Sequence, residues 1–405
     1  MDNYPRYYNV SKLAWDTEVA RGVKPIVVAV NGDWDFAKGG QVFPAHSTQD
    51  VENAIKLAVS KLKSGESLTL FVNDHGSSPN SVNEPLSSEI VLYGGTVTKL
   101  PPQLSHSDLM NLIKKYVPQE NNVKLVGVHC FSGGLHSIAF NLPNVCSAAS
   151  TDFRTPTKTT GEINLYGKGF WNEVRSKTIN LTGNGKTNLY EAHLAGTMMD
   201  TENEGRGELS SMAYVDSVLG YGAYDGKDPA RKEKKIHGKT IVEISIGPPG
   251  PKLPDLCNLN SGGIDIEKIQ AISSDIADIL KEAALNVSGK GPSAQPLRNV
   301  YEYVAAEWAK NKETDVAKLK RLQLESEKLH KEWNNFSSVE KWWKRADYTK
   351  KFDALEAKTK EELGRFLAVY HTMQRLDRVN AFMKKATPAQ KEKFASLLKC
   401  EWSPL

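Results

Sequence analysis

The order of apolar segments along the chain is the sequence feature that most constrains the fold. Up to about residue 250, short and continuous apolar runs alternate with longer segments in which apolar residues recur every three or four positions. The short runs are typical of buried strands, and the longer segments are typical of amphipathic helices. Strands that are apolar throughout and separated by helices indicate a mostly parallel sheet covered on both faces. We therefore predict an α/β fold for this part of the chain.

The apolar runs give definite positions for these elements. A hairpin is expected near Gly94 and Gly95, and amphipathic helices over 48–65 and 106–117. The sheet is expected to contain five strands, at 25–33, 68–73, 123–129, 145–150 and 240–247.

The pattern changes to helices alone after residue 264. Apolar residues recur at helical spacing to the end of the chain, and three N-terminal capping signals interrupt them. These signals are Ser337 with Glu340, Thr359 with Glu362, and Thr387 followed by Pro388. We therefore predict a sheet domain over 1–250, a linker rich in proline and glycine over 251–263, and an all-α helical bundle over 264–405.

Length and composition limit the number of domains, the class of partner and the cellular compartment. A chain of 405 residues is long enough for two domains, and its formal net charge of +4 gives no argument for nucleic acid or a membrane as a partner. No apolar stretch is long enough to span a membrane, and the first residues do not resemble a signal peptide. The four cysteines form no C-x-x-C pair, so free thiols in a reducing compartment are expected. This predicts a cytoplasmic protein, or an exported effector acting in a host cytosol.

Two of the predicted strands end on a reactive side chain followed by glycine. The strand at 68–73 runs into Asp74, His75 and Gly76, and the strand at 123–129 runs into Cys130. Active sites of open parallel sheets lie beyond the carboxyl ends of the strands. Adjacent strands would therefore bring His75 and Cys130 together above one edge of the sheet.

This pairing is suited to nucleophilic catalysis. A thiol has a pKa near 8.5 in water, and a neighbouring imidazole can remove its proton or stabilise the thiolate. The backbone N–H groups of Gly76 and Cys130 could hold a developing oxyanion. We predict a Cys130–His75 dyad that needs no metal and no organic cofactor.

At these residues the chain resembles a clan of cysteine peptidases that includes caspases, metacaspases and legumains. An apolar strand ending in His-Gly, followed by one ending in Cys-x-x-Gly, carries the resemblance, and "NDHGS" looks most like the legumain form. The likeness covers roughly residues 20–250. It implies a caspase-like α/β/α sandwich and a thiol protease that acts on a protein or peptide substrate. In this family the pocket for the residue before the scissile bond is lined by the loops that here contain Asp33 and Asp152.

The charges of Asp33 and Asp152 indicate which side chain the pocket would accept. Two carboxylates in the pocket would favour a Lys or Arg side chain, whereas Arg154 would favour an acidic one. Asp74 and His129 lie next to the dyad residues, but the alternation of side chains along a strand turns them to the other face. They are therefore not expected to take part in catalysis.

Three functions remain open at this level. The first is a cysteine endopeptidase that works through an acyl-enzyme and cleaves after basic residues. The second is an inactive peptidase-like scaffold whose helical domain binds a partner protein, which the unusual neighbours His129 and Phe131 favour. The third is a transamidase or ligase that transfers the acyl group to an amine. No nucleic acid partner is expected.

Overall fold

The computed structural model describes most of the chain and divides it into two compact units. We call the first the sheet unit (Met1–Met199, Arg206–Pro248 and Ala381–Leu405) and the second the hairpin unit (Asp200–Gly205 and Pro249–Asn380). The described residues are 4–29, 35–37, 40–77, 89–92, 103–153, 157, 159, 161–203, 206–220, 231–236, 239–244, 257–258, 263–264, 267, 269–271, 273 and 294–405.

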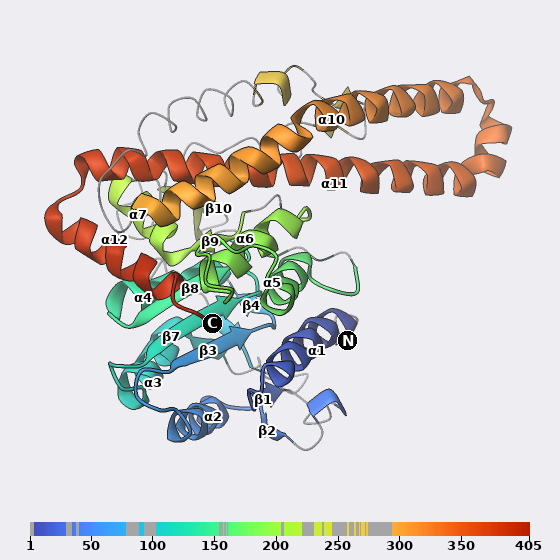
Figure 1. Ribbon diagram of the computed structural model, residues 1–405. Coiled ribbons are helices and arrows are strands. Elements are labelled where there is room, and N and C mark those ends of the chain that lie inside the picture. The colour runs from blue at the N-terminus through green and yellow to red at the C-terminus, as the bar shows by residue number, and fades with distance from the viewer. Residues whose placement is uncertain are drawn as a thin grey trace. The chain divides into compact units, whose positions relative to one another are not determined.

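A four-stranded sheet forms the centre of the sheet unit (Figure 1). Its strand order is β3-β7-β8-β9, with parallel pairing from β3 to β8 and antiparallel pairing of β9. The prediction of an α/β fold is confirmed, as are the strands expected near 68, 123 and 145, although the sheet is mixed. The strands are β3 (Ser67–Val72), β7 (Asn122–Gly127), β8 (Val145–Ala149) and β9 (Glu208–Leu209).

Helices pack against both faces of this sheet. Val123 and Leu125 of β7 are completely buried and belong to a core cluster with apolar residues of α2, α3 and α4. On β3, Phe71 makes an edge-to-face contact with Trp171 of α5, at 5.2 Å between ring centroids, and α6 contacts β8. The helices are α2 (Thr48–Ser60), α3 (His106–Tyr116), α4 (His136–Asn141), α5 (Leu165–Ser176), α6 (Leu189–Met199) and α7 (Ser210–Leu219).

Four small sheets accompany the central one. The strand expected at 25–33 is present over Ile26–Ala29, but its assignment to the central sheet was wrong, because it pairs in parallel with Gln41–Pro44 in a separate sheet. The prediction that the strand at 240–247 belongs to the parallel sheet was wrong. This strand, β11, pairs antiparallel with β10 in a separate hairpin. Only two residues separate β10 from β11, which suits a hairpin and not a parallel crossover. The expected turn at Gly94 and Gly95 lies outside the described residues. The small sheets are β1 (Ile26–Ala29) with β2 (Gln41–Pro44), β4 (Gly76–Ser77) with β5 (Glu89–Val91) and β6 (Gln103–Ser105), β10 (Arg231–Ile236) with β11 (Lys239–Ile244), and β12 (Cys257–Asn258) with β13 (Gly263–Ile264).

Two long antiparallel helices, α10 (Ala294–Asn335) and α11 (Ser338–Lys385), dominate the hairpin unit (Figure 1). The predicted capping box at the start of α11 is confirmed, since the Ser337 N–H donates to Glu340 (2.9 Å) and the Glu340 N–H to the Ser337 hydroxyl (3.3 Å). The second predicted capping box, Thr359 with Glu362, was wrong. Thr359 lies inside α11, and its hydroxyl donates to the Leu355 carbonyl one turn earlier (2.8 Å). Among the described residues, no helix is long and apolar enough to cross a membrane.

The last helix, α12 (Pro388–Glu401), belongs to the sheet unit, although its sequence continues the helical region. Its predicted cap is confirmed, because Thr387 and Gln390 form a capping box before Pro388. The helix packs against α7 and β8. Its buried Glu401 carboxylate accepts hydrogen bonds from the hydroxyl groups of Ser210 and Ser211. A sheet unit without α12 would therefore leave buried hydroxyl donors without their acceptor.

A disulfide joins α12 to the central sheet. Cys400 is bonded to Cys146 of β8, 254 residues earlier in the sequence. The expectation of free thiols was wrong for this pair, because cysteines so far apart carry no sequence spacing that indicates a bond. The argument for a reducing compartment therefore no longer holds.

The final residues after α12 are also held by the sheet. Lys124 of β7 is completely buried, and its ammonium group donates to the carbonyl oxygens of Ser403 (2.6 Å) and Pro404. Burial lowers the pKa of Lys124 to about 7. Trp402 stacks on Tyr190 of α6, with ring centroids 5.0 Å apart. The C-terminal segment is thus part of the core of the sheet unit.

Candidate active site

The register of the central sheet places His75 and Cys130 at neighbouring strand ends. β3 and β7 are parallel, and Val72 at the end of β3 pairs with Gly127 at the end of β7. His75 lies three residues after Val72, and Cys130 lies three residues after Gly127. The prediction that two adjacent strands carry these residues to one edge of the sheet is confirmed, while their catalytic roles stay predictions.

The thiol of Cys130 is surrounded by peptide groups. Its Sγ atom lies 3.7 Å from the carbonyl oxygen of Thr157. Burial raises the pKa of the Cys130 thiol, and hydrogen bonds from the peptide groups of Thr157, Gly76 and Cys130 itself act in the opposite direction. The thiol is therefore mostly protonated at neutral pH. Two of these peptide groups, those of Gly76 and Cys130, are the predicted oxyanion donors.

A sharp turn presents this thiol. Phe131, directly after Cys130, has φ 60° and ψ 28°, a left-handed conformation that a large side chain rarely adopts. A 3₁₀ helix (Ser132–Leu135) follows and leads into α4. A Cβ atom added to Gly133 would lie 2.4 Å from the Phe153 nitrogen, so the backbones after β7 and β8 touch there. The Ser-Gly-Gly sequence after Phe131 thus permits a tight turn against the neighbouring strand end.

Gly76 has a packing role that the sequence did not reveal. A Cβ atom at this position would lie 2.1 Å from the Cys130 carbonyl oxygen and 2.8 Å from the Cδ2 atom of the His129 ring. Glycine is therefore required by the protein's own backbone, in addition to any substrate that would approach it.

We expect Gly76→Ala to disturb both the fold and the thiol. The alanine methyl group would push the β3 and β7 ends apart, at a cost of about 1–3 kcal/mol in the free energy of unfolding. Displacing the Gly76 N–H should also slow alkylation of Cys130, because the hydrogen bond that lowers the pKa of the thiol is weakened and less thiolate is present. Urea denaturation and the rate of thiol alkylation measure the two effects. Gly161→Ala is the control, because a Cβ atom there meets nothing within 4 Å. A Gly76→Ala protein that matches this control would contradict the close contact.

His75 is neutral at physiological pH. Burial lowers its pKa, and the positive charge of Arg6 adds to the effect. A neutral imidazole can accept a proton from the thiol. The Asp74 carboxylate accepts a hydrogen bond from the His75 backbone N–H (2.6 Å), as its expected position away from the ring implies. Burial raises the pKa of Asp74 to about 6.

The first helix, α1 (Tyr4–Ala20), brings a residue to the site that sequence reasoning missed. The Tyr7 ring meets the His75 ring edge to face, with centroids 5.3 Å apart. Burial raises the pKa of Tyr7, and the charges of Asp74 and Cys130 raise it further. Asn73, at the end of β3, donates from its side chain to the Tyr7 carbonyl (2.8 Å) and so anchors the helix.

A signal for α1 is present in the sequence. Pro5 lies in its first turn, where proline is favoured, and Val10, Ala14 and Thr17 recur at helical spacing and are buried.

The neighbouring histidine, His129, points into the core. It is 1% exposed, and burial lowers its pKa to about 3. Its ring lies 5.9 Å from that of His106, and neither ring nitrogen has a hydrogen-bond partner among the residues that the structure describes. A buried neutral imidazole in this position cannot serve as the base for the Cys130 thiol. His129 is a core residue, as strand alternation predicts.

Asp152 lies beyond the end of β8, the third strand at this edge of the sheet. β8 pairs with β7 in parallel, so the segments that follow β3, β7 and β8 hold His75, Cys130 and Asp152 in this order. The role of Asp152 in binding a basic side chain stays a prediction. Asp33 and Arg154, the other residues expected in this pocket, lie outside the described residues.

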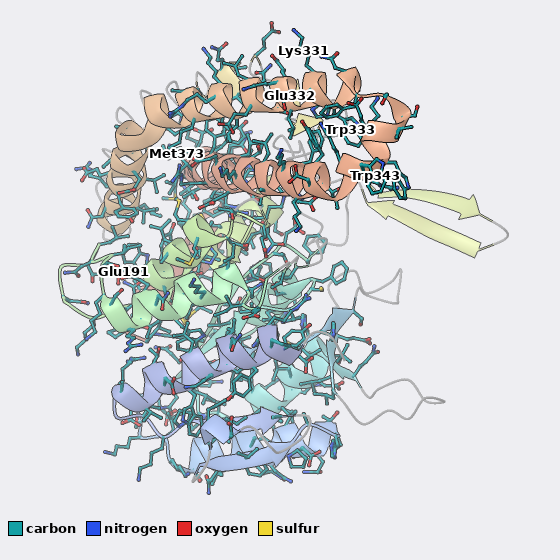
Figure 2. The ribbon with its side chains drawn as sticks, turned by 90° about the vertical axis from the view of Figure 1, so that its right-hand side faces the viewer. Glu191, Lys331, Glu332, Trp333, Trp343 and Met373 are labelled. Atoms are coloured by element: carbon teal, nitrogen blue, oxygen red, sulfur yellow. A yellow bond between two sulfur atoms is a disulfide. The ribbon has the colours of Figure 1, made fainter. Side chains whose placement is uncertain are left out.

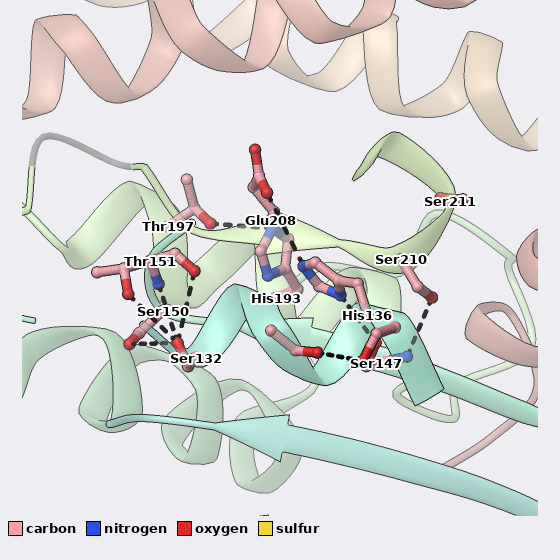
Figure 3. A network of polar contacts seen from close by, with 12 residues as sticks. Ser132, His136, Ser147, Ser150, Thr151, His193, Thr197, Glu208, Ser210 and Ser211 are labelled. Carbon is pink, nitrogen blue, oxygen red and sulfur yellow. Dashed lines mark hydrogen bonds and ion pairs between the residues drawn. The ribbon is translucent and has the colours of Figure 1, made fainter. Parts of the chain in front are cut away.

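Hydroxyl groups join the loops beneath the site. The Ser132 hydroxyl lies 3.4 Å from those of Ser150 and Thr151 (Figure 3). The Ser150 hydroxyl lies 3.1 Å from the Thr157 hydroxyl. Thr157 in turn donates to the His129 carbonyl (3.0 Å). These contacts fix the segments after β7 and β8 relative to each other.

A second polar group lies deeper in the sheet unit. The His136 ring bonds the Ser147 hydroxyl at 2.8 Å and lies 3.9 Å from the Glu208 carboxylate (Figure 3). This serine, histidine and glutamate resemble a catalytic triad in composition. Ser147 and His136 are 0% exposed, so no substrate can reach the hydroxyl, and the group is structural.

Comparison with known proteins does not extend these observations. No protein-family model matches the chain, and no match was found among curated proteins. The function is therefore inferred from the site itself.

Proposed function

We propose that this protein is a cysteine endopeptidase in which Cys130 is the nucleophile and His75 the general base. The observation that carries the proposal is the placement of the Cys130 thiol. It follows the end of β7 in a tight turn, hydrogen bonds from the peptide groups of Gly76 and Cys130 act to lower its pKa, and His75 precedes Gly76 after the end of the adjacent strand. A structural cysteine needs neither the tight turn nor these donors.

The pKa shifts favour a particular order of proton transfer. The thiol is protonated at neutral pH because burial raises its pKa, and the imidazole is neutral because burial lowers its own. His75 would therefore take the thiol proton as Cys130 attacks the scissile carbonyl, without a preformed ion pair.

The remaining steps use the same groups. The Gly76 and Cys130 N–H groups would stabilise the oxyanion, and His75 would then protonate the leaving amine. Water activated by His75 would hydrolyse the acyl-enzyme and release the free thiol.

The architecture supports assignment to the clan of caspases and legumains. A parallel β3-β7-β8 order with helices on both faces fits the caspase-like sandwich implied by the His-Gly and Cys-x-x-Gly motifs. Within this proposal, Asp152 favours substrates with Lys or Arg before the scissile bond.

The pH dependence of thiol alkylation tests the dyad. In the wild-type protein, the rate of Cys130 alkylation by iodoacetamide should rise with pH through the lowered pKa of His75, below its usual 6.5, since only neutral imidazole accepts the proton. In His75→Ala the rate should rise only at higher pH, through the pKa of the thiol, which burial raises above its usual range. Mass spectrometry of the alkylated peptide separates Cys130 from the other cysteines.

Identical pH profiles in the two proteins would contradict the dyad. Cys130 would then react as an ordinary buried thiol, and the inactive scaffold would become the better interpretation. Where the dyad is present, adding an amine nucleophile to a peptide-cleavage reaction separates hydrolysis from acyl transfer, because a transamidase would give the amide product.

A further inference from the structure

The aromatic residues at the free end of the α10–α11 hairpin form two groups. Trp333, Phe336 and Tyr348 pack together, and the ring centroid of Tyr348 lies 5.4 Å from Trp333 and 5.3 Å from Phe336. The Tyr348 hydroxyl donates to the Glu332 carboxylate of α10 (3.0 Å). This cluster joins the two helices, so the hairpin end has a core without the remaining aromatic residues.

The second group faces outward. Trp342 and Trp343 are 70% and 74% exposed, and Val339 is 67% exposed. Together with exposed Ala346, these residues have the spacing i, i+3, i+4 and i+7 and form one apolar stripe on α11. Figure 2 shows Trp343 at the end of the hairpin. We call the stripe of Val339, Trp342, Trp343 and Ala346 the tryptophan face.

The tryptophan face lies among positive charges. Residues 331–351 contain six Lys or Arg and three Asp or Glu. Two of the acids are engaged locally, since Glu340 caps Ser337 and Asp347 pairs with Lys351 (2.9 Å). Lys344, Arg345 and Lys350 form no ion pair in the part of the chain that the structure describes. This end of the hairpin is therefore complementary to a negatively charged surface.

We infer that the tryptophan face is a docking surface for an anionic lipid bilayer. Indole rings favour the boundary between headgroups and acyl chains, and lysine and arginine beside them attract anionic headgroups. Val339 and Ala346 extend the apolar area and offer nothing to a nucleic acid base. Trp342 and Trp343 also pack edge to face against each other, with centroids 4.7 Å apart, so they do not form two open platforms for stacked bases.

Vesicle binding by the full-length protein tests this inference. Co-sedimentation is measured with vesicles of phosphatidylcholine alone and of phosphatidylcholine mixed with phosphatidylglycerol. We expect binding to the anionic vesicles only, weakening as salt is added. Trp342→Ala/Trp343→Ala should lower the affinity at least about tenfold, because both indoles leave the interface. Lys344→Gln and Arg345→Gln should each lower it about fivefold.

Leu324→Ala is the matched control, because Leu324 is a 65% exposed apolar residue of α10 outside the tryptophan face. It should bind like the wild type. Thermal unfolding checks that each variant is folded, and the two charge variants keep the test valid if the double tryptophan variant is not.

Three results would overturn the inference. The first is no binding to anionic vesicles at low salt, and the second is equal binding to these vesicles by the tryptophan variant and the wild type. The third is binding to single-stranded DNA and not to vesicles, with the tryptophan and charge variants weakening the binding to DNA. Loss of a dimer in the tryptophan variant, without vesicle binding, would assign the face to a second copy of the chain instead.

Discussion

Cys130→Ala is expected to abolish peptide cleavage and to leave the fold intact. The proposed reaction forms a covalent bond to the Cys130 sulfur, and no other group at the end of β7 can replace it. The rate should fall by a factor on the order of 10⁴ or more, to the level set by binding and the oxyanion donors alone. His75→Ala should lower the rate by about 10²–10⁴-fold, because the protonated thiol loses its base. Cleavage of a mixed peptide library, followed by mass spectrometry, measures both.

The controls separate a lost nucleophile from a lost fold. The Cys130 side chain is only partly buried, so its removal should change the free energy of unfolding by less than about 1 kcal/mol. His46→Ala changes an exposed histidine before α2 and should keep full activity. A Cys130→Ala protein that cleaves peptides like the wild type would remove the proposed nucleophile, whatever the site geometry.

Reduction of the Cys146–Cys400 disulfide is expected to destabilise the sheet unit strongly. The bond closes a loop with a sequence separation of 254 residues, and a loop of this length restricts the unfolded chain considerably. Opening it should lower the free energy of unfolding by roughly 2–5 kcal/mol. Urea denaturation with and without dithiothreitol measures the change.

A double variant makes this result specific to the bond. In Cys146→Ala/Cys400→Ala, the reductant should have no further effect, and the protein should be about as unstable as the reduced wild type. Unfolding midpoints of the wild type that coincide with and without reductant would show that the bond adds no stability. Peptide cleavage should persist after reduction while the protein stays folded. Because β7 and β8 are parallel, Cys146 at the start of β8 and Cys130 beyond the end of β7 lie at opposite ends of the sheet.

Local sequence pattern was sufficient for the central strands and for placing the two reactive residues after neighbouring strand ends. The apolar runs at 68–73 and 123–129 are continuous because both faces of a central parallel strand are buried. Since parallel strands end at the same edge of a sheet, the residues that follow them, His75 and Cys130, could be placed together without coordinates. The caps at Ser337 and Thr387 were predictable for a similar reason, because each involves residues within one helical turn.

Only the tertiary structure decided what surrounds these elements. Tyr7 reaches His75 through a helix whose position depends on Asn73, and Gly76 is required by a carbonyl 54 residues later in the sequence. Thr359 fits a capping pattern, yet it lies within α11 because the helix continues through it.

The C-terminal segment is the clearest case of tertiary control. Its helical periodicity is the same as that of α10 and α11, but Cys400 and Glu401 bind partners in β8 and α7 that lie about 190–254 residues earlier. Periodicity records which side of an element is buried and not which partner buries it. The sequence therefore determined the central strands and the placement of His75 and Cys130 after neighbouring strand ends, and long-range packing decided which unit each element joined.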